Sequence, residues 1–112
     1  MVKEIRIPIY NARVTFVYMD DISVEMRKYC DDVSDNELAM TVWWADKHDY
    51  VIGIRKDAFS ITTLVHESCH LTHRILENAG VPNSSLEDEA EAYLVGYIAD
   101  TLYKLVQDEN ND

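Results

Sequence analysis

The chain has 112 residues, of which 47% are apolar, and this is enough to bury one hydrophobic core without disulfide bonds. Its net charge of −11 disfavours binding to nucleic acids, because phosphate groups are also negative. No apolar run has the pattern of a signal peptide or approaches the roughly 18 residues of a membrane span. We therefore expect a soluble, cytoplasmic protein that does not enter a membrane, with Cys30 and Cys69 reduced.

The first half of the chain predicts strands around one short helix. Four segments have the alternation or the β-branched and aromatic content of strands: residues 4–10, 13–19, 38–46 and 50–56. We expect a turn at Asn11 between the first two and a polar turn containing His48 between the last two. Between these pairs, Ile22, Met26 and Tyr29 recur at helical spacing, which predicts a short helix.

Two long helices are expected in the second half. Ser60 can cap one that runs from Ile61 to Asn78, and Gly80 can end it. The other is expected from Leu86 to Val106, with the acidic residues 107–112 as a frayed tail. The order β-β-α-β-β-α-α predicts one α+β domain over the whole chain, with helices packed on a mostly antiparallel sheet.

Residues 66–70 read HESCH and lie inside the first long helix. His66 and His70 fall within about 40° of each other on a helix, so both imidazoles can bind one metal ion. Glu67 lies about 100° further round, where a carboxylate can accept a proton from water beside the metal. The apolar arc on the other side of this helix consists of Ile61, Leu64, Leu71, Thr72, Ile75, Leu76 and Ala79. The HExxH pattern thus predicts a zinc site, although a merely solvated polar face would have the same periodicity.

A third metal ligand must come from outside this helix. His73 lies on the histidine face but about 4.5 Å further along the axis than His70, too far for a straight helix to share one ion. Acidic residues in the first turns of the second long helix are the obvious source, although they would also favour the helix dipole. Glu89 and Glu91 lie about 160° apart on that helix, so helical geometry leaves both possible and only one can face the metal.

Residues 63–71, TLVHESCHL, resemble the zinc-binding motif of metallopeptidases of the gluzincin type, in which a glutamate on a following helix completes the site. Thr72 stands where such enzymes usually have a hydrophobic residue. In that family the glutamate often belongs to an E-x-x-A motif, and Glu89-Ala90-Glu91-Ala92 matches it, with eighteen residues between His70 and Glu89. The resemblance covers about residues 50–100. It is closest to small metallopeptidases encoded by bacteriophages and more distant to SprT-like and ImmA/IrrE-like zincins.

This resemblance implies a zincin-like domain with one Zn²⁺ per chain, held by His66, His70 and Glu89. It also implies hydrolysis of a peptide or protein substrate with Glu67 as general base, in the host cytoplasm if a phage encodes the chain. The developing oxyanion needs a further donor, for which the candidates are Tyr93, Tyr97 and His73.

Two further expectations concern the strands. The strand at residues 50–56 is similar to the sheet edge that lines the cleft in such metallopeptidases, and this resemblance implies that an extended peptide could add to it. Trp43 and Trp44 are adjacent in one strand and should face opposite sides of the sheet.

The alternative function is a non-catalytic acidic protein that binds a basic host factor or mimics nucleic acid. In that case the zinc would be structural, and its fourth coordination position would be closed to water.

Overall fold

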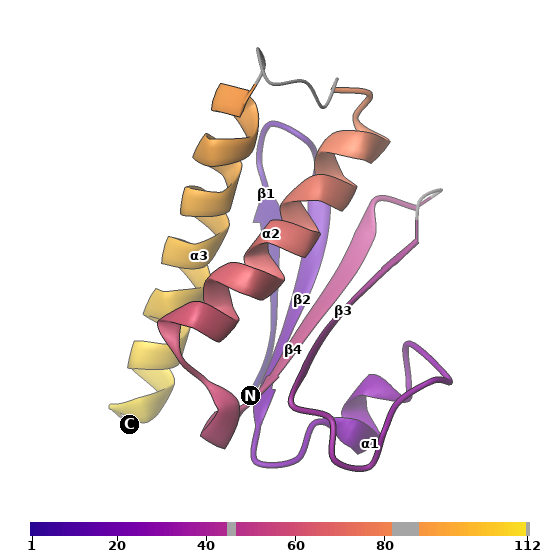
Figure 1. The fold of residues 1–112 in the computed structure, drawn as a ribbon, viewed down its shortest axis with the longest axis vertical. Helices are drawn as coiled ribbons and strands as arrows, with labels where there is room; N and C mark the ends of the chain where they lie inside the picture. The colour runs from indigo at the N-terminus through magenta and orange to yellow at the C-terminus, as the bar shows by residue number, and fades with distance from the viewer. Residues whose placement is uncertain (45–46, 82–87, 112) are drawn as a thin grey trace.

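A computed structural model describes residues 1–44, 47–81 and 88–111. The strands are β1 (Val2–Ile7), β2 (Ala12–Met19), β3 (Ala39–Trp44) and β4 (Asp49–Arg55). The helices are α1 (Ser23–Met26), α2 (Ile61–Asn78) and α3 (Asp88–Asn110), and a short 3-10 helix spans Lys56–Ala58. The expected element order and the α+β class with a mostly antiparallel sheet and two long helices are confirmed (Figure 1).

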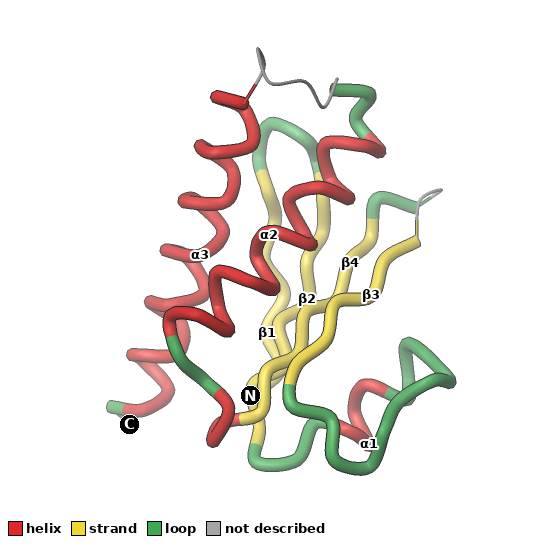
Figure 2. The backbone as a smooth tube through the Cα atoms, viewed as in Figure 1, coloured by secondary structure: helices red, strands yellow, loops and turns green. Residues whose placement is uncertain are grey.

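The four described strands form one sheet in the order β1-β2-β4-β3 (Figure 2). β1–β2 and β3–β4 are antiparallel, whereas β2 and β4 are parallel. The expectation that residues 50–56 form a sheet edge is therefore wrong, because β4 is paired on both sides. Its continuous run of buried residues from Tyr50 to Ile54 is typical of a strand covered on both faces. The strand at the edge beside α2 is β3.

The strands alternate their side chains between two separate cores. Helices α2 and α3 cover one face, where Phe16 and Ile52 are fully buried. On the other face Met26 of α1 and the residue that precedes the helix, its N-cap Ile22, pack against the sheet. A Cβ atom added at Gly53 would lie 2.7 Å from Sδ of Met26, so the glycine is what lets α1 approach so closely.

Local signals define the turns and both ends of α2 as expected. Asn11 has φ 50° in the turn between β1 and β2, a left-handed conformation that asparagine tolerates. Oγ of Ser60 accepts a hydrogen bond from the backbone N–H of Thr63 at 3.1 Å, which caps the helix. Gly80 has φ 75° just beyond the last turn. The expected start of the next helix at Leu86 falls outside the described residues.

The C-terminal segment differs from expectation, because α3 continues to Asn110 instead of fraying after residue 106. Leu102 and Val106 are buried, and they anchor the last turns on the sheet. Tyr18 donates a hydrogen bond from its hydroxyl to Asn110 at 3.4 Å, which ties the end of the helix to β2. No helix in the described part of the chain is both long enough and apolar enough to cross a membrane.

Candidate metal centre

Helix α2 has one side in the core and one side in solvent. Leu64, Leu71 and Ile75 are at most 1% exposed on the sheet side, while His66 and His70 are exposed on the other. Thr72 and Leu76 are also buried, as the periodicity predicts. The expected apolar arc is wrong only at its ends: Ile61 and Ala79 are exposed because they lie at the two ends of the helix.

The two histidines have the geometry of a metal-binding pair. Their Nε2 atoms lie 3.2 Å apart. Two nitrogens bound at about 2.0–2.1 Å to a tetrahedral Zn²⁺ would be about 3.3 Å from each other. Ligand atoms of His66, Glu67 and His70 all lie within 4.8 Å of one another. This donor set therefore fits zinc.

The carboxylate of Glu67 is buried next to these imidazoles. The residue is 6% exposed, and its Oε1 accepts a hydrogen bond from Oγ1 of Thr41 at 2.8 Å. Its Oε2 lies 3.9 Å from Nε2 of His66. Thr41 thus occupies one carboxylate oxygen and leaves the other turned toward the histidines. The role of Thr41 is absent from the sequence expectations; its only signal is a hydroxyl at a helix-facing position of an amphipathic strand.

The acidic residue of α3 that contacts α2 is Glu91. Its Oε1 lies 2.5 Å from Nε2 of His73, one turn beyond His70. Glu89 is exposed and forms no hydrogen bond or ion pair with any described residue. Because Glu89 lies about 160° from Glu91 around α3, it points away from α2. The structure brings together His66, Glu67 and His70, and it leaves both Glu89 and Glu91 outside this group.

The two tyrosines considered as oxyanion donors lie on the far side of α3. Tyr93 is 76% exposed and Tyr97 is 40% exposed. Both line a 340 Å³ groove between α3 and the β1–β2 turn, together with Ile9. Of the three candidates, only His73 is on the histidine side of α2.

The tryptophans of β3 face opposite sides of the sheet, as expected. Trp44 packs near Tyr29 on the α1 face, with ring centroids 6.4 Å apart. Trp43 faces α2, and the guanidinium carbon of Arg74 lies 4.1 Å from the centroid of its ring. Thr41–Glu67 and Trp43–Arg74 are therefore two successive links between the edge strand and α2.

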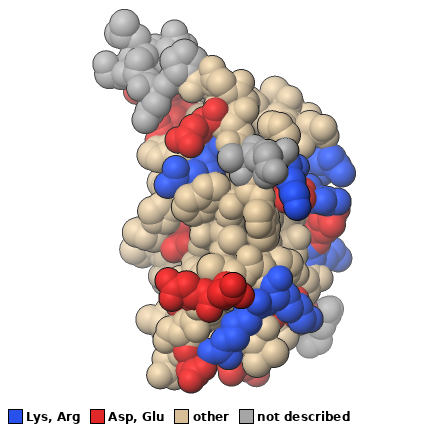
Figure 3. Space-filling model, turned by 90° about the vertical axis from the view of Figure 1, so that its right-hand side faces the viewer, with Lys and Arg blue, Asp and Glu red and all other residues tan. Residues whose placement is uncertain are grey.

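Viewed from the right-hand side of Figure 1, where β3 lies, the middle of the surface is mostly uncharged (Figure 3).

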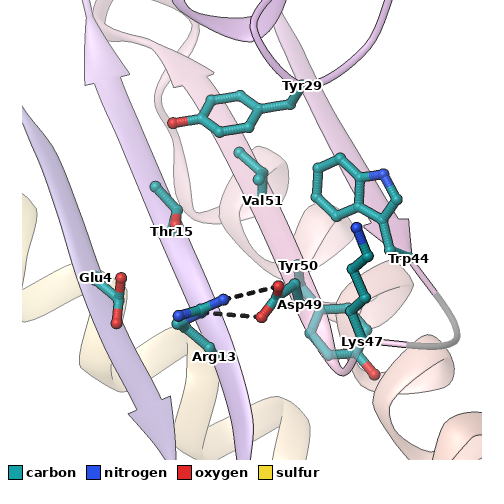
Figure 4. A pocket seen from close by; sticks show the side chains of 9 residues that line it. All are labelled: Glu4, Arg13, Thr15, Tyr29, Trp44, Lys47, Asp49, Tyr50 and Val51. Carbon is teal, nitrogen blue, oxygen red and sulfur yellow. Dashed lines mark hydrogen bonds and ion pairs between the residues drawn. The ribbon is translucent and has the colours of Figure 1, made fainter.

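A second pocket of 340 Å³ lies on the α1 face of the sheet (Figure 4). Arg13 donates two hydrogen bonds to the carboxylate of Asp49, at 2.9 and 2.8 Å. These bonds hold the pKa of Asp49 below its usual value and raise the pKa of Arg13. Burial raises the pKa of Tyr29, which lines the same pocket. Because the two charges of the ion pair satisfy each other, this pocket is a less suitable metal site than the histidine side of α2.

Comparison of the chain with protein-family models, curated proteins and solved structures finds no match. The relation to zinc metallopeptidases therefore rests on the motif in residues 63–71 and stays a prediction. Any function has to be argued from the arrangement of His66, His70, Glu67 and Thr41.

Proposed function

We propose that the protein is a zinc-dependent peptidase whose metal is bound by His66 and His70. The observation that carries this proposal is the pair of Nε2 atoms 3.2 Å apart with a buried carboxylate beside them. Burying a carboxylate costs free energy unless it is paired, and among the described residues only Thr41 donates a hydrogen bond to Glu67. A cation between the imidazoles would supply the compensation that the remaining oxygen lacks.

The side chains of this site have complementary parts in such a reaction. When bound, Zn²⁺ supplies a Lewis acid that polarises a peptide carbonyl and makes water a better nucleophile near neutral pH. Glu67 accepts the proton of the attacking water on Oε2 and later gives it to the leaving amine. Thr41 keeps the carboxylate in this orientation through Oε1, which makes it a positioning residue.

The substrate backbone has a natural place along β3. This strand lies next to α2, pairs only with β4 among the described strands, and therefore has one free edge. An extended peptide that adds to this edge satisfies its backbone hydrogen bonds and passes the histidine side of α2. The edge strand in this proposal is β3, in place of residues 50–56.

A carboxylate from α3 would complete the ligand set. The E-x-x-A match favours Glu89, but Glu91 is the residue that already contacts α2, so we expect Glu91 to be the ligand. Glu91→Gln should then weaken zinc binding by more than about tenfold, while Glu89→Gln leaves it nearly unchanged. Competition with a chromophoric chelator measures both, and the reverse ranking would return the assignment to Glu89.

The direct test of the proposal combines metal content and hydrolysis. Purified protein should contain one Zn²⁺ per chain by elemental analysis and should cleave a peptide library. Incubation with a chelator should remove the activity, and added Zn²⁺ should restore it. Protein that binds no zinc under any loading condition would contradict the proposal.

A non-catalytic binding role is the second candidate, and the groove beside α3 is the observation that favours it. Ile9 is 82% exposed and Tyr93 is 76% exposed, which is unusual for such large apolar side chains at one site. A binding role predicts that Tyr93→Ser abolishes capture of a partner and Glu67→Gln leaves it intact. Proteolysis instead predicts that Glu67→Gln abolishes hydrolysis and Tyr93→Ser leaves hydrolysis unchanged, since Glu67 takes part in the chemistry and Tyr93 does not.

A further inference from the structure

The two contacts between α2 and β3 differ in whether their hydrogen-bonding groups remain available to a ligand. In the first contact, Thr41 and Glu67 hydrogen-bond each other. In the second, the guanidinium of Arg74 stacks on Trp43 and forms no hydrogen bond with any described residue. Among the described residues its one ion pair is with Glu77, at 3.6 Å, which is longer than a hydrogen bond, and the side chain of Glu77 is 70% exposed. The N–H donors of a well-oriented guanidinium are therefore available to a ligand.

This free guanidinium lies at a defined distance from the metal-binding residues. Arg74 follows His70 by four residues, which is about 6 Å along the axis of α2. Trp43 follows Thr41 by two residues, which is about 7 Å along β3. Figure 1 shows that β3 and α2 run in the same general direction, so the contact of Trp43 with Arg74 lies further along both elements than the contact of Thr41 with Glu67. A peptide added to β3 repeats its side chains on one face at the same interval of about 7 Å.

We propose that Arg74, held by Trp43, is a subsite for an acidic side chain of the substrate. The acidic residue lies two positions from the substrate residue that is level with Thr41. This inference rests on the proposed function, because it places a peptide along β3 beside His66 and His70. It goes further by naming the class of substrate, which is a peptide with Asp or Glu at one fixed position.

The chemistry of the pair matches a carboxylate better than other side chains. A planar guanidinium binds a carboxylate through two parallel hydrogen bonds. Stacking on an indole ring already restricts the guanidinium, so it loses less conformational freedom when the carboxylate binds. The net charge of −11 offers an acidic ligand no general attraction. Any preference for acidic peptides must therefore come from a local cation. The contribution of Arg74 can thus be measured apart from the effect of the overall charge.

Peptide binding to the zinc-loaded Glu67→Gln protein tests the inference without requiring turnover. The probes are short, capped peptides of Ala, Ser and Tyr in which one Glu is moved through successive positions, with Gln analogues as controls. Binding is measured by titration calorimetry. We expect one Glu position to bind about tenfold more tightly than its Gln analogue. Adding Arg74→Gln should remove this difference, and Arg74→Lys should keep only part of it.

Arg27→Gln is the matched control, because it removes the same charge from the C-cap of α1, on the opposite face of the sheet, and should leave the preference intact. Equal binding of Glu and Gln peptides, a preference that survives Arg74→Gln, or no binding of any peptide would overturn the inference. Hydrolysis by the wild type without an acidic preference would overturn the subsite and leave the proposed function standing. Binding with the Arg74-dependent preference but no hydrolysis would support the subsite and contradict the proposed peptidase function.

Discussion

The two sides of α2 are made from interleaved residues of one helix but obey different physical constraints. On the sheet side, Leu64, Leu71 and Ile75 are at most 1% exposed and stabilise the fold by burial. On the other side, His66 and His70 are exposed and add little to the core. Folding therefore requires the first side, whereas the second side is free to serve chemistry. Substitutions on the two sides should have separable effects.

The largest effect is expected on the histidine side. His66→Ala or His70→Ala should lower zinc affinity by more than about 100-fold, because loss of a direct ligand exceeds the loss of a residue that only supports one. The melting temperature of the metal-free protein should change little, since these side chains are exposed. Elemental analysis and thermal melts in chelator measure the two properties. Full zinc content in both variants would contradict the assignment of the metal centre.

Glu67→Gln tests the residue between the two sides. The amide retains the size of the carboxylate and can still bond Thr41, but it cannot accept a proton from water. We expect peptide hydrolysis to fall by about 10²- to 10⁴-fold, with zinc content unchanged. Steady-state kinetics on one defined peptide measures the loss. Activity that persists at the wild-type level would indicate that another group is the base.

Leu71→Ala should have the complementary effect on the sheet side. Removing a fully buried leucine is expected to reduce the free energy of unfolding by about 2–5 kcal/mol. Urea denaturation in the presence of chelator measures this change. Protein that remains folded should bind zinc with nearly wild-type affinity. A large loss of affinity in the folded variant would mean that the two sides are coupled.

Thr72→Val sharpens the same comparison with a smaller change. Thr72 is fully buried, and its hydroxyl has no hydrogen-bond partner among the described residues. Valine has nearly the same shape without the polar atom, so we expect stabilisation of about 1 kcal/mol. The readout is again the urea midpoint, and Thr72→Ser serves as a control that keeps the hydroxyl. A destabilised Thr72→Val protein would show that the hydroxyl is paired in solution.

The smallest effect is expected at the Arg13–Asp49 ion pair, which touches neither side of α2. The pKa of Asp49 is lowered by Arg13, so the pair stabilises the fold at pH values above the pKa of an unpaired aspartate. That contribution is lost as the pH falls through the lowered pKa. Asp49→Asn should lower the melting temperature by about 1–2 °C at neutral pH and by less in acid. A difference that grows on acidification would contradict this sign.

Short-range patterns in the sequence determined the helices and strands and placed the two histidines of the candidate metal site together. The 3.6-residue period, the cap at Ser60 and the glycine at position 80 define α2, and the i, i+4 spacing brings His66 and His70 together in any α-helix. Alternation likewise predicted the strands and the opposite directions of Trp43 and Trp44. These features follow from backbone geometry within one segment, so they need no knowledge of the rest of the chain.

Only the tertiary structure decided which segments meet. Strand pairing depends on the burial of the whole sheet, which puts β4 between β2 and β3 and makes β3 the edge beside α2. The contacts of Glu67 with Thr41, of Arg74 with Trp43 and of His73 with Glu91 each join segments at least 18 residues apart. Periodicity places a side chain on a face of its own element but does not identify the element opposite. For this reason the sequence predicted the two histidines, while the threonine that orients Glu67 and the acidic residue that contacts α2 emerged only from packing.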